Sequence, residues 1–338
     1  IKVFVNNSQQ NEEIKNIQGI KLNKFTNKME PGVFFIDDIE YKINSRGFRG
    51  EEFSVENNKN CRIISFGGSI TLGPEKAYPN ILEEKLKKSG IDCESLNFGM
   101  TSRGLNYIED LMINEAINYS PNIITIMANR NATMYDSYGS SSVTHDVILN
   151  DFEYYIYKIN RYLFLNIMTH RFIDLSYRRV VSWFYDDENK IVDPYNPKAF
   201  HLKNYFESKY INQISNIIKF CEKNNIQVVL IKEAHYIDPP YQKSLKSLSK
   251  LEILEKLLKY DEQKNKNKLF WMYTNAILNN NLDEIKTKNP DIIVVDPTEE
   301  LYRHQKNINF FDGTHLKNNG HEIVANEIFL SIKNYLKF

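Results

Sequence analysis

The chain has no excess of charge of either sign, because its 43 basic and 43 acidic residues give a formal net charge of zero. Proteins that bind nucleic acid or anionic membranes electrostatically carry a basic surplus, since neutralising phosphates supplies much of their affinity. We therefore expect no nucleic-acid partner. The chain also lacks any run near the roughly 18 to 20 consecutive apolar residues of a membrane helix, and we expect no membrane segment within it.

Cysteine is scarce, with only Cys61, Cys93 and Cys221. Three scattered cysteines are too few for a disulfide framework, and none forms a C-x-x-C pair or stands at metal-ligand spacing. Each lies in or beside an apolar run, so we expect all three to be small buried hydrophobic side chains. No metal or cofactor is predicted.

The sequence leaves the compartment and the oligomeric state open. Its first residue is Ile1 rather than methionine. Removal of an N-terminal signal or anchor would make the protein exported or bound to the cell envelope, and otherwise it would be cytoplasmic.

What the chain does contain is a regular alternation of short apolar runs with helical patterns. The 338 residues are 42% hydrophobic and 25% charged, as in a soluble globular protein. Apolar runs at 62–66, 93–98, 123–127, 227–231 and 292–295 predict buried strands. Amphipathic patterns predict helices at 78–88, 107–117, 205–221, 245–260, 269–285 and 320–336. This alternation predicts an α/β fold with a doubly wound, mainly parallel five-stranded sheet.

Two segments interrupt this pattern. Residues 1–60 are polar with short alternating stretches, which predicts a strand-rich lead-in that packs on a main domain of residues 61–338. Residues 132–202 contain no clean strand and many aromatic residues, which predicts a helical insertion after the third strand. The glycine and arginine turn at 44–50 is interpreted as a structural loop, with anion binding as the alternative.

Residues 61–73, with the sequence CRIISFGGSITLG, hold the main candidate for a reactive group. An apolar strand there meets two glycines and then Ser69, a hydroxyl at the tip of a sharp turn. In an open α/β sheet this is the edge where ligands bind. Taken alone, however, such a stretch is more often a plain strand-to-helix turn than an active site.

Other polar side chains follow the other predicted strands. Asn131 follows the third strand, and Asp312 and His315 follow the fifth. A serine needs an imidazole base, which in turn needs a carboxylate to orient it. We expect Asp312 to reach His315 Nδ1 and His315 Nε2 to face Ser69.

The same edge would supply groups that bind the substrate. An oxyanion hole would comprise the Asn131 amide with backbone N–H groups of Ser69 and Ser102. Arg103 and Arg130 would flank the crevice, as substrate-anion ligands or in structural ion pairs.

The sequence resembles the SGNH, or GDSL-type, serine hydrolases. The resemblance rests on four ordered blocks: FGGSITLG, LNFGMTSRG at 96–104, PNIITIMANRN at 121–131 and DGTHL at 312–316. It implies a flavodoxin-like fold with Ser69 as nucleophile, His315 as base, Asp312 as its orienting acid and Asn131 as an oxyanion donor.

Three positions depart from the family pattern. Gly68 replaces the aspartate of the family's name motif, which is expected to loosen the serine turn. Ser102 stands where the second block has its oxyanion glycine, unless Gly99 takes that role. Ala132 replaces an acid that commonly follows Asn131, which removes a supporting hydrogen bond.

The predicted function is a metal-independent serine esterase that removes a small acyl group, with O-acetyl on a carbohydrate as the substrate class that the resemblance implies. One alternative is an acyltransferase that uses the same residues on a glycan acceptor, and another is an inactive glycan-binding module.

Motifs for other chemistries fail. The Gly68 to Gly73 stretch lacks the Lys-Ser/Thr of a phosphate loop, no G-x-G-x-x-G is present, and His321-Glu322 lacks the second histidine of a zinc helix. The remaining histidines have no partner pattern and are interpreted as surface or packing residues: His145, His170, His201, His235, His304 and His321.

Overall fold

The computed structural model describes residues 28–36, 39–101, 103–132, 209–236, 248–249, 252–253, 267–303 and 306–336. The predicted insertion, apart from Ala132, and most of the predicted helix at 245–260 lie outside these residues.

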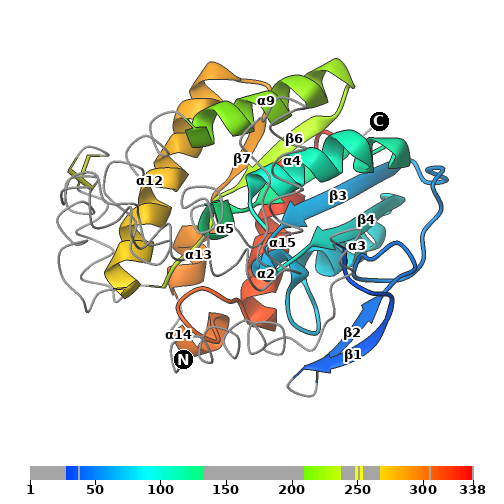
Figure 1. Cartoon of the computed structure of the whole chain (residues 1–338), viewed down its shortest axis with the longest axis horizontal. Coiled ribbons are helices and arrows are strands. Elements are labelled where there is room, and N and C mark those ends of the chain that lie inside the picture. The colour runs from blue at the N-terminus through cyan, green and yellow to red at the C-terminus, as the bar shows by residue number, and fades with distance from the viewer. Residues whose placement is uncertain are drawn as a thin grey trace, which may run out of the picture.

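The main sheet has five parallel strands, as the sequence predicts (Figure 1). In chain order they are β3 (Cys61–Gly67), β4 (Cys93–Gly99), β5 (Ile123–Met127), β6 (Gln227–Ile231) and β7 (Ile293–Val295). Their spatial order is β4-β3-β5-β6-β7. The chain runs first to one side of β3 and then returns to the other, so the switch point of the topology lies between β3 and β5. In open α/β sheets the ligand crevice lies outside the carboxyl ends of the strands at such a point.

Helices cover both faces of the sheet. Successive residues of a strand point to opposite faces, and the apolar strands therefore present a hydrophobic surface on each side. Ile64 and Phe66 of β3 share one hydrophobic cluster with α4 (Leu105–Asn114), α9 (Tyr210–Lys223) and α12 (Asn267–Lys288). Ile63 of β3 shares the other with α3 (Tyr78–Lys88), α13 (Thr298–Arg303) and α15 (Asn318–Ile332). The short helical turns are α2 (Ser69–Leu72), η1 (Ala116–Tyr119), α5 (Asn129–Asn131) and α14 (Lys306–Asn309).

The described part of the lead-in forms an antiparallel hairpin of β1 (Gly32–Ile36) and β2 (Ile39–Ile43). The glycine and arginine turn after β2 packs into the domain, since the Phe48 ring stacks on Phe98 of β4 with 3.6 Å between centroids. Arg49 pairs its backbone with Asn97 of β4. The turn is therefore a structural element. Its Arg49 also contacts the helix that carries Ser69.

All three cysteines are buried, as predicted, but the expectation that they take no part in a disulfide was wrong for two of them. Cys61 and Cys93 form a disulfide, while Cys221 is free and buried. The two paired residues face each other at the first positions of β3 and β4, with 4.6 Å between their Cα atoms. The disulfide therefore links adjacent strands at the edge of the sheet opposite Ser69.

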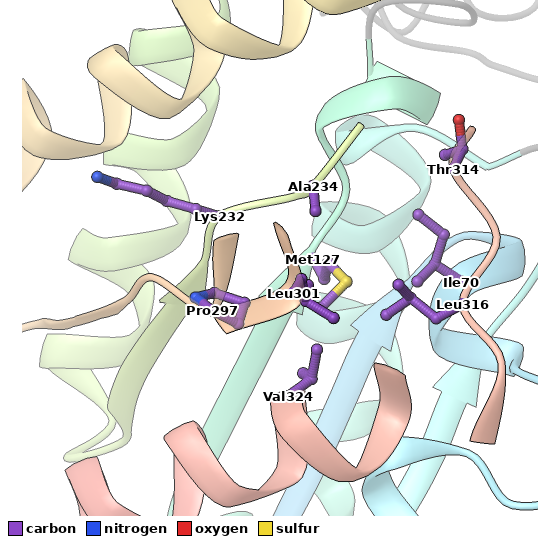
Figure 2. Close-up of a pocket in the computed structure, with 9 residues that line it drawn as sticks. All are labelled: Ile70, Met127, Lys232, Ala234, Pro297, Leu301, Thr314, Leu316 and Val324. Carbon is purple, nitrogen blue, oxygen red and sulfur yellow. The ribbon is translucent and has the colours of Figure 1, made fainter. Parts of the chain in front are cut away.

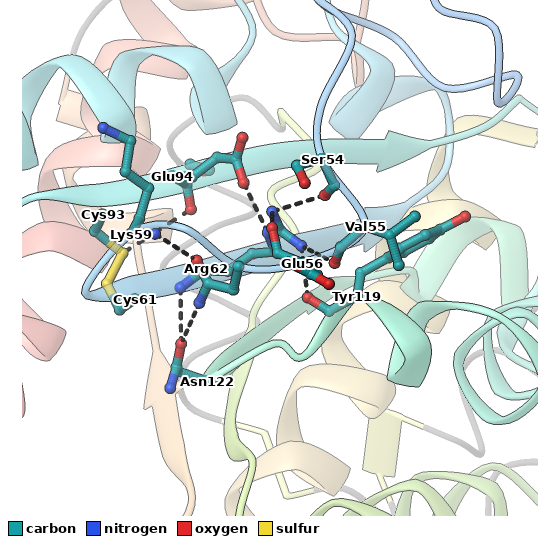
Figure 3. Close-up of polar contacts among 12 residues, drawn as sticks. Ser54, Val55, Glu56, Lys59, Cys61, Arg62, Cys93, Glu94, Tyr119 and Asn122 are labelled. Carbon is teal, nitrogen blue, oxygen red and sulfur yellow. Dashed lines mark hydrogen bonds and ion pairs between the residues drawn. A yellow bond between two sulfur atoms is a disulfide. The ribbon is translucent and has the colours of Figure 1, made fainter.

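Arg62, next to this disulfide, ties the lead-in to the sheet (Figure 3). Its side chain is 1% exposed and donates hydrogen bonds to Glu94, to the Tyr119 carbonyl and to the carbonyls of residues 54–56. A buried guanidinium needs this many acceptors because its desolvation is costly without them.

Candidate active site

Ser69 is the first residue of α2 and lies just beyond β3, at the carboxyl edge of the sheet. All seven residues of β3 are buried, and the chain leaves the strand through Gly68 into the first position of α2. The Ser69 hydroxyl lies 2.9 Å from His315 Nε2, although 246 positions separate the two residues in the sequence. A serine within hydrogen-bond reach of an imidazole is the geometry of an activated nucleophile.

The short helix that carries Ser69 is held from outside. Asn97 donates its amide to the Thr71 carbonyl at 2.9 Å, and the Arg49 guanidinium donates to the carbonyls of Leu72, Gly73 and Glu75. A four-residue helix has too few internal hydrogen bonds to hold its own shape. These side chains therefore satisfy its C-terminal carbonyls and fix the serine turn.

Asp312 orients the imidazole. Its Oδ2 lies 2.7 Å from His315 Nδ1, and its Oδ1 accepts backbone N–H bonds from Thr314 at 2.6 Å and His315 at 2.8 Å. Because an ionised carboxylate only accepts hydrogen bonds, Nδ1 carries the proton and Nε2 of the neutral ring is free to accept from Ser69.

The same contacts change the acidity of Asp312. Partial burial works to raise its pKa, but the hydrogen bonds from the His315 ring and from the two backbone N–H groups outweigh burial. Together they hold the pKa of Asp312 well below its ordinary value. Asp312 is therefore ionised throughout the neutral range and keeps one tautomer of His315.

Residues 310–316, here called the 310–316 loop, carry both groups. Phe310 and Leu316 pair across the base of the loop, and the Phe311 N–H donates to the His315 carbonyl at 2.9 Å. On the side of β6, the Tyr236 N–H donates to the Gly313 carbonyl at 2.7 Å. The loop is thus closed on itself and fastened to the segment after β6.

A small apolar pocket lies beneath this loop (Figure 2). Its lining comes from α2, β5, the segments after β6 and β7, α13, the loop itself and α15: Ile70, Met127, Lys232, Ala234, Pro297, Leu301, Thr314, Leu316 and Val324. It holds about 190 Å³ of space in total and is too narrow for a substrate. Two of its lining residues, Ile70 and Leu316, directly follow Ser69 and His315 in the sequence.

Asn131 lies across the switch point from Ser69, in α5 after β5. It is 8% exposed, and its Nδ2 has no hydrogen-bond partner among the described residues. A Cβ built on Gly68 would lie 2.6 Å from Asn131 Cγ and nearer still to Nδ2. The missing aspartate at position 68 thus leaves a space that the Asn131 amide fills, where we had expected a loosened turn. A buried amide donor beside a serine hydroxyl is the arrangement that can stabilise an oxyanion.

A buried amide network anchors α5. Asn129 is 1% exposed, donates to Asn279 at 2.7 Å and accepts the Tyr210 hydroxyl at 2.7 Å. Asn275 and Asn279 of α12 in turn donate to the Glu233 carbonyl. The turn that carries Asn131 is therefore fixed to α9, α12 and the segment after β6.

The other predicted site residues are placed as follows. Ser102 and the side chain of Arg130 lie outside the described residues. The Gly99 N–H donates to Asn97 Oδ1 at 2.9 Å, so it is not available to an oxyanion. Arg103 is 3% exposed and lies over the Tyr107 ring at 5.0 Å, a position that favours a structural role.

Sequence reasoning missed two residues near the site. Arg49 lies in the lead-in, where nothing in its motif indicates a contact with α2. His235 lies in the segment after β6 and contacts the 310–316 loop. His235 follows the end of β6, just as Ser69 and Asn131 follow the ends of β3 and β5. The same reasoning from strand ends would therefore have identified it.

Among the described residues, no group of three or more histidine, cysteine, aspartate or glutamate side chains is arranged to hold a metal ion. Within the same part of the chain, no helix has the length and apolar character needed to cross a membrane.

No protein-family model and no curated protein sequence matches the chain. Solved structures with a similar arrangement include a Bacteroides fragilis protein assigned as an acylhydrolase, with a TM-score of 0.43, 15% identity and coverage of 85% of this chain and 93% of that one. A catalytic variant of a Geobacillus stearothermophilus acetylxylan esterase has a TM-score of 0.43 and 12% identity, covering 80% and 94%. A GDSL-like lipase from Bacteroides thetaiotaomicron has a TM-score of 0.39 and 12% identity, covering 82% and 89%. Similarity at this level does not assign an activity to the chain.

Proposed function

We propose that this chain is a serine esterase of the SGNH type that works through an acyl-enzyme. The observation that carries the proposal is the continuous chain of hydrogen-bond distances from Ser69 Oγ to His315 Nε2 and from His315 Nδ1 to Asp312. The ordered sequence blocks and the strand order of the sheet support the same proposal.

The reaction follows from these atoms. Ser69 Oγ attacks the ester carbonyl as its proton passes to His315 Nε2, and the oxyanion accepts from Asn131 Nδ2 and the Ser69 backbone N–H. Collapse of this intermediate breaks the bond to the alcohol, which takes the proton from His315. Water then attacks the acyl-enzyme with His315 again as base, which releases the acid and restores Ser69.

An O-acetylated carbohydrate is the substrate class that we favour. Phe311 precedes Asp312 and is 58% exposed, with Lys317 Nζ 5.6 Å from its ring centroid. An exposed ring of this kind, on the loop that carries the base, offers an apolar surface on which the face of a sugar can stack.

The esterase is tested by p-nitrophenyl acetate turnover and by fluorophosphonate labelling. Ser69→Ala should reduce kcat by at least about a thousandfold and abolish labelling, because in the described part of the chain the hydroxyl that lies 2.9 Å from His315 Nε2 is that of Ser69. Ser89→Ala, at an exposed position after α3, is the matched control. Equal turnover by wild type and Ser69→Ala would refute the assignment of Ser69 as the nucleophile. Transfer of acetyl to an added oligosaccharide, in place of acetate release, would identify the protein as a transferase.

The carbohydrate is tested separately with O-acetylated xylo-oligosaccharides as the probe. Phe311→Ala should lower kcat/KM on this probe about tenfold and leave p-nitrophenyl acetate unchanged, whereas Phe311→Trp should retain activity. Tyr335→Ala, at another half-exposed aromatic residue, is the control. Equal losses on both substrates would contradict a sugar platform.

We also propose an oxidising compartment for the protein, outside the reducing cytosol. The Cys61–Cys93 disulfide supports this, because such bonds persist mainly in exported proteins. If the producing cells are quenched in acid and their free thiols are then alkylated, Cys61 and Cys93 should remain unmodified because their sulfur atoms are joined. Alkylation of both would oppose the proposal.

A further inference from the structure

His235 contacts the 310–316 loop at Thr314, the residue before His315. It is 7% exposed, and its Nδ1 lies 2.8 Å from the Thr314 hydroxyl. Thr314 is itself 3% exposed and stands directly before His315. A buried hydrogen bond between two side chains therefore joins the segment after β6 to the turn that holds the base.

The His235 ring also packs on the neighbouring residue of that turn. A Cβ on Gly313 would lie 3.3 Å from His235 Cε1 and 3.4 Å from its Nε2, so the ring rests against the Gly313 backbone. The next residue, Tyr236, donates its N–H to the Gly313 carbonyl at 2.7 Å. The two residues between Asp312 and His315 are thus held from one side by residues 235–236.

His235 is in turn fixed by α13. The Tyr302 hydroxyl accepts the His235 N–H at 3.0 Å and donates to the His235 carbonyl at 3.1 Å. One partly buried hydroxyl therefore binds both backbone polar groups of His235. The path from α13 to Tyr302, to His235 and to Thr314 is continuous and contains no exposed link.

We propose that His235 is a positioning residue for the base: through the Thr314 hydroxyl and the Gly313 backbone it holds the Asp312–His315 turn where His315 Nε2 reaches Ser69. This inference rests on the proposed esterase function. His235 acts only through the turn and does not touch the substrate. Because proton transfer depends on the Ser69–His315 distance, loss of the contact acts on kcat, and KM stays nearly constant.

Three variants test this role on p-nitrophenyl acetate. His235→Ala should lower kcat about 10- to 100-fold with KM within about twofold, as a displacement near 1 Å does. His235→Asn should recover most of kcat, since its side chain can replace Nδ1 toward Thr314. Thr314→Val removes the hydroxyl at nearly constant volume and should lower kcat by a similar factor. The double variant His235→Ala/Thr314→Val should be no worse than His235→Ala alone.

A spectroscopic readout separates positioning from a general loss of folding. The proton that Nδ1 of His315 shares with Asp312 should give a downfield proton NMR signal in wild type and His235→Asn, shifted or lost in His235→Ala. Urea unfolding identifies any variant that is not folded, and Thr314→Val then takes the place of His235→Ala.

The outcomes are distinct. If the wild type neither labels nor turns over substrate, the proposed esterase fails, and the NMR comparison still decides whether His235 positions His315. If the wild type is active and folded His235→Ala and Thr314→Val keep the wild-type kcat and NMR signal, the positioning role is overturned and the esterase stands. Lower stability with unchanged kcat and signal would likewise make His235 a packing residue only.

Discussion

The side-chain amide of Asn131 fills the space that a β-carbon on Gly68 would need. The two residues lie at the ends of neighbouring parallel strands, β3 and β5, on either side of the switch point. The glycine before Ser69 and the close approach of the Asn131 amide therefore depend on each other.

The first prediction is that Gly68→Ala lowers kcat by displacing Asn131. The loss of one oxyanion donor costs about 100- to 1000-fold in kcat, and we expect a decrease approaching that range in p-nitrophenyl acetate turnover. Fluorophosphonate labelling of Ser69 should slow in parallel.

A double-mutant cycle provides the control. In an Asn131→Ala background the β-carbon at position 68 has no amide to displace, so the added loss should be small. Full additivity of the two substitutions would show that Gly68 matters for another reason. Asn118→Ala, at an exposed amide, controls for asparagine replacement in general.

The second prediction concerns Arg49, which is 8% exposed and whose guanidinium donates to three carbonyls at and just after the end of α2. Arg49→Met keeps an apolar stem but leaves these acceptors unpaired, at about 1–3 kcal/mol for each group that stays buried. We expect lower stability in urea together with lower kcat, because the same turn carries Ser69. Arg303→Met, at an exposed arginine of α13, should change neither quantity. Unchanged stability of Arg49→Met would contradict the role of Arg49 in holding the serine turn.

The third prediction is that the disulfide stabilises the fold without contributing to catalysis. The bond closes a loop with a sequence separation of 32, for which chain entropy gives about 3–4 kcal/mol. The double variant Cys61→Ala/Cys93→Ala should lose about this much stability in urea. Its kcat should be retained, because the bond lies at the opposite end of β3 from Ser69, about 20 Å away by strand rise.

Reduction gives the matched control for the disulfide. A reductant should lower the urea midpoint of the wild type and leave that of the double variant unchanged. A wild type insensitive to reductant would mean that the two thiols are not joined in the folded protein.

The fourth prediction concerns acid stability and His321, which is fully buried on α15 and accepts the Tyr78 N–H at its Nδ1 at 3.1 Å. Burial, with the nearby charges of Arg49 and His315, lowers the pKa of His321 from 6.5 to about 3. Between these values the unfolded chain binds a proton that the folded chain does not, so stability falls as the pH falls through this window.

The slope of stability against pH measures this effect. His321→Gln keeps an acceptor for Tyr78 but does not titrate, so the wild type should lose up to about 1.4 kcal/mol more per pH unit than the variant between pH 6 and 4. Parallel slopes for the two proteins would show that folding does not lower the pKa of His321.

The sequence predicted the five strands and the positions of Ser69, Asn131, Asp312 and His315 for one physical reason. Buried parallel strands require apolar runs, and their carboxyl ends meet at a common edge, so residues that follow such runs can be brought together without knowing any side-chain contact.

The contacts that the sequence did not reveal depend on register and on packing between distant segments. Cys61 and Cys93 meet because β3 and β4 pair from their first residues, and neither strand pairing nor register can be read from composition. His235 and Thr314 are 79 positions apart, and no motif joins them. Gly68 was recognised as a departure, but its effect depends on where Asn131 lies.

The distance in sequence between Ser69 and His315 has a consequence for the order in which the protein acquires its chemistry. Ser69 and Asn131, the proposed nucleophile and oxyanion donor, belong to the first half of the chain. His315, the proposed base, arrives only with the segment that precedes α15. During synthesis the serine therefore remains without its base until this segment has been made and docked. In refolding, contacts so distant in sequence form slowly, so fluorophosphonate labelling should report the final step of assembly, after the sheet has formed.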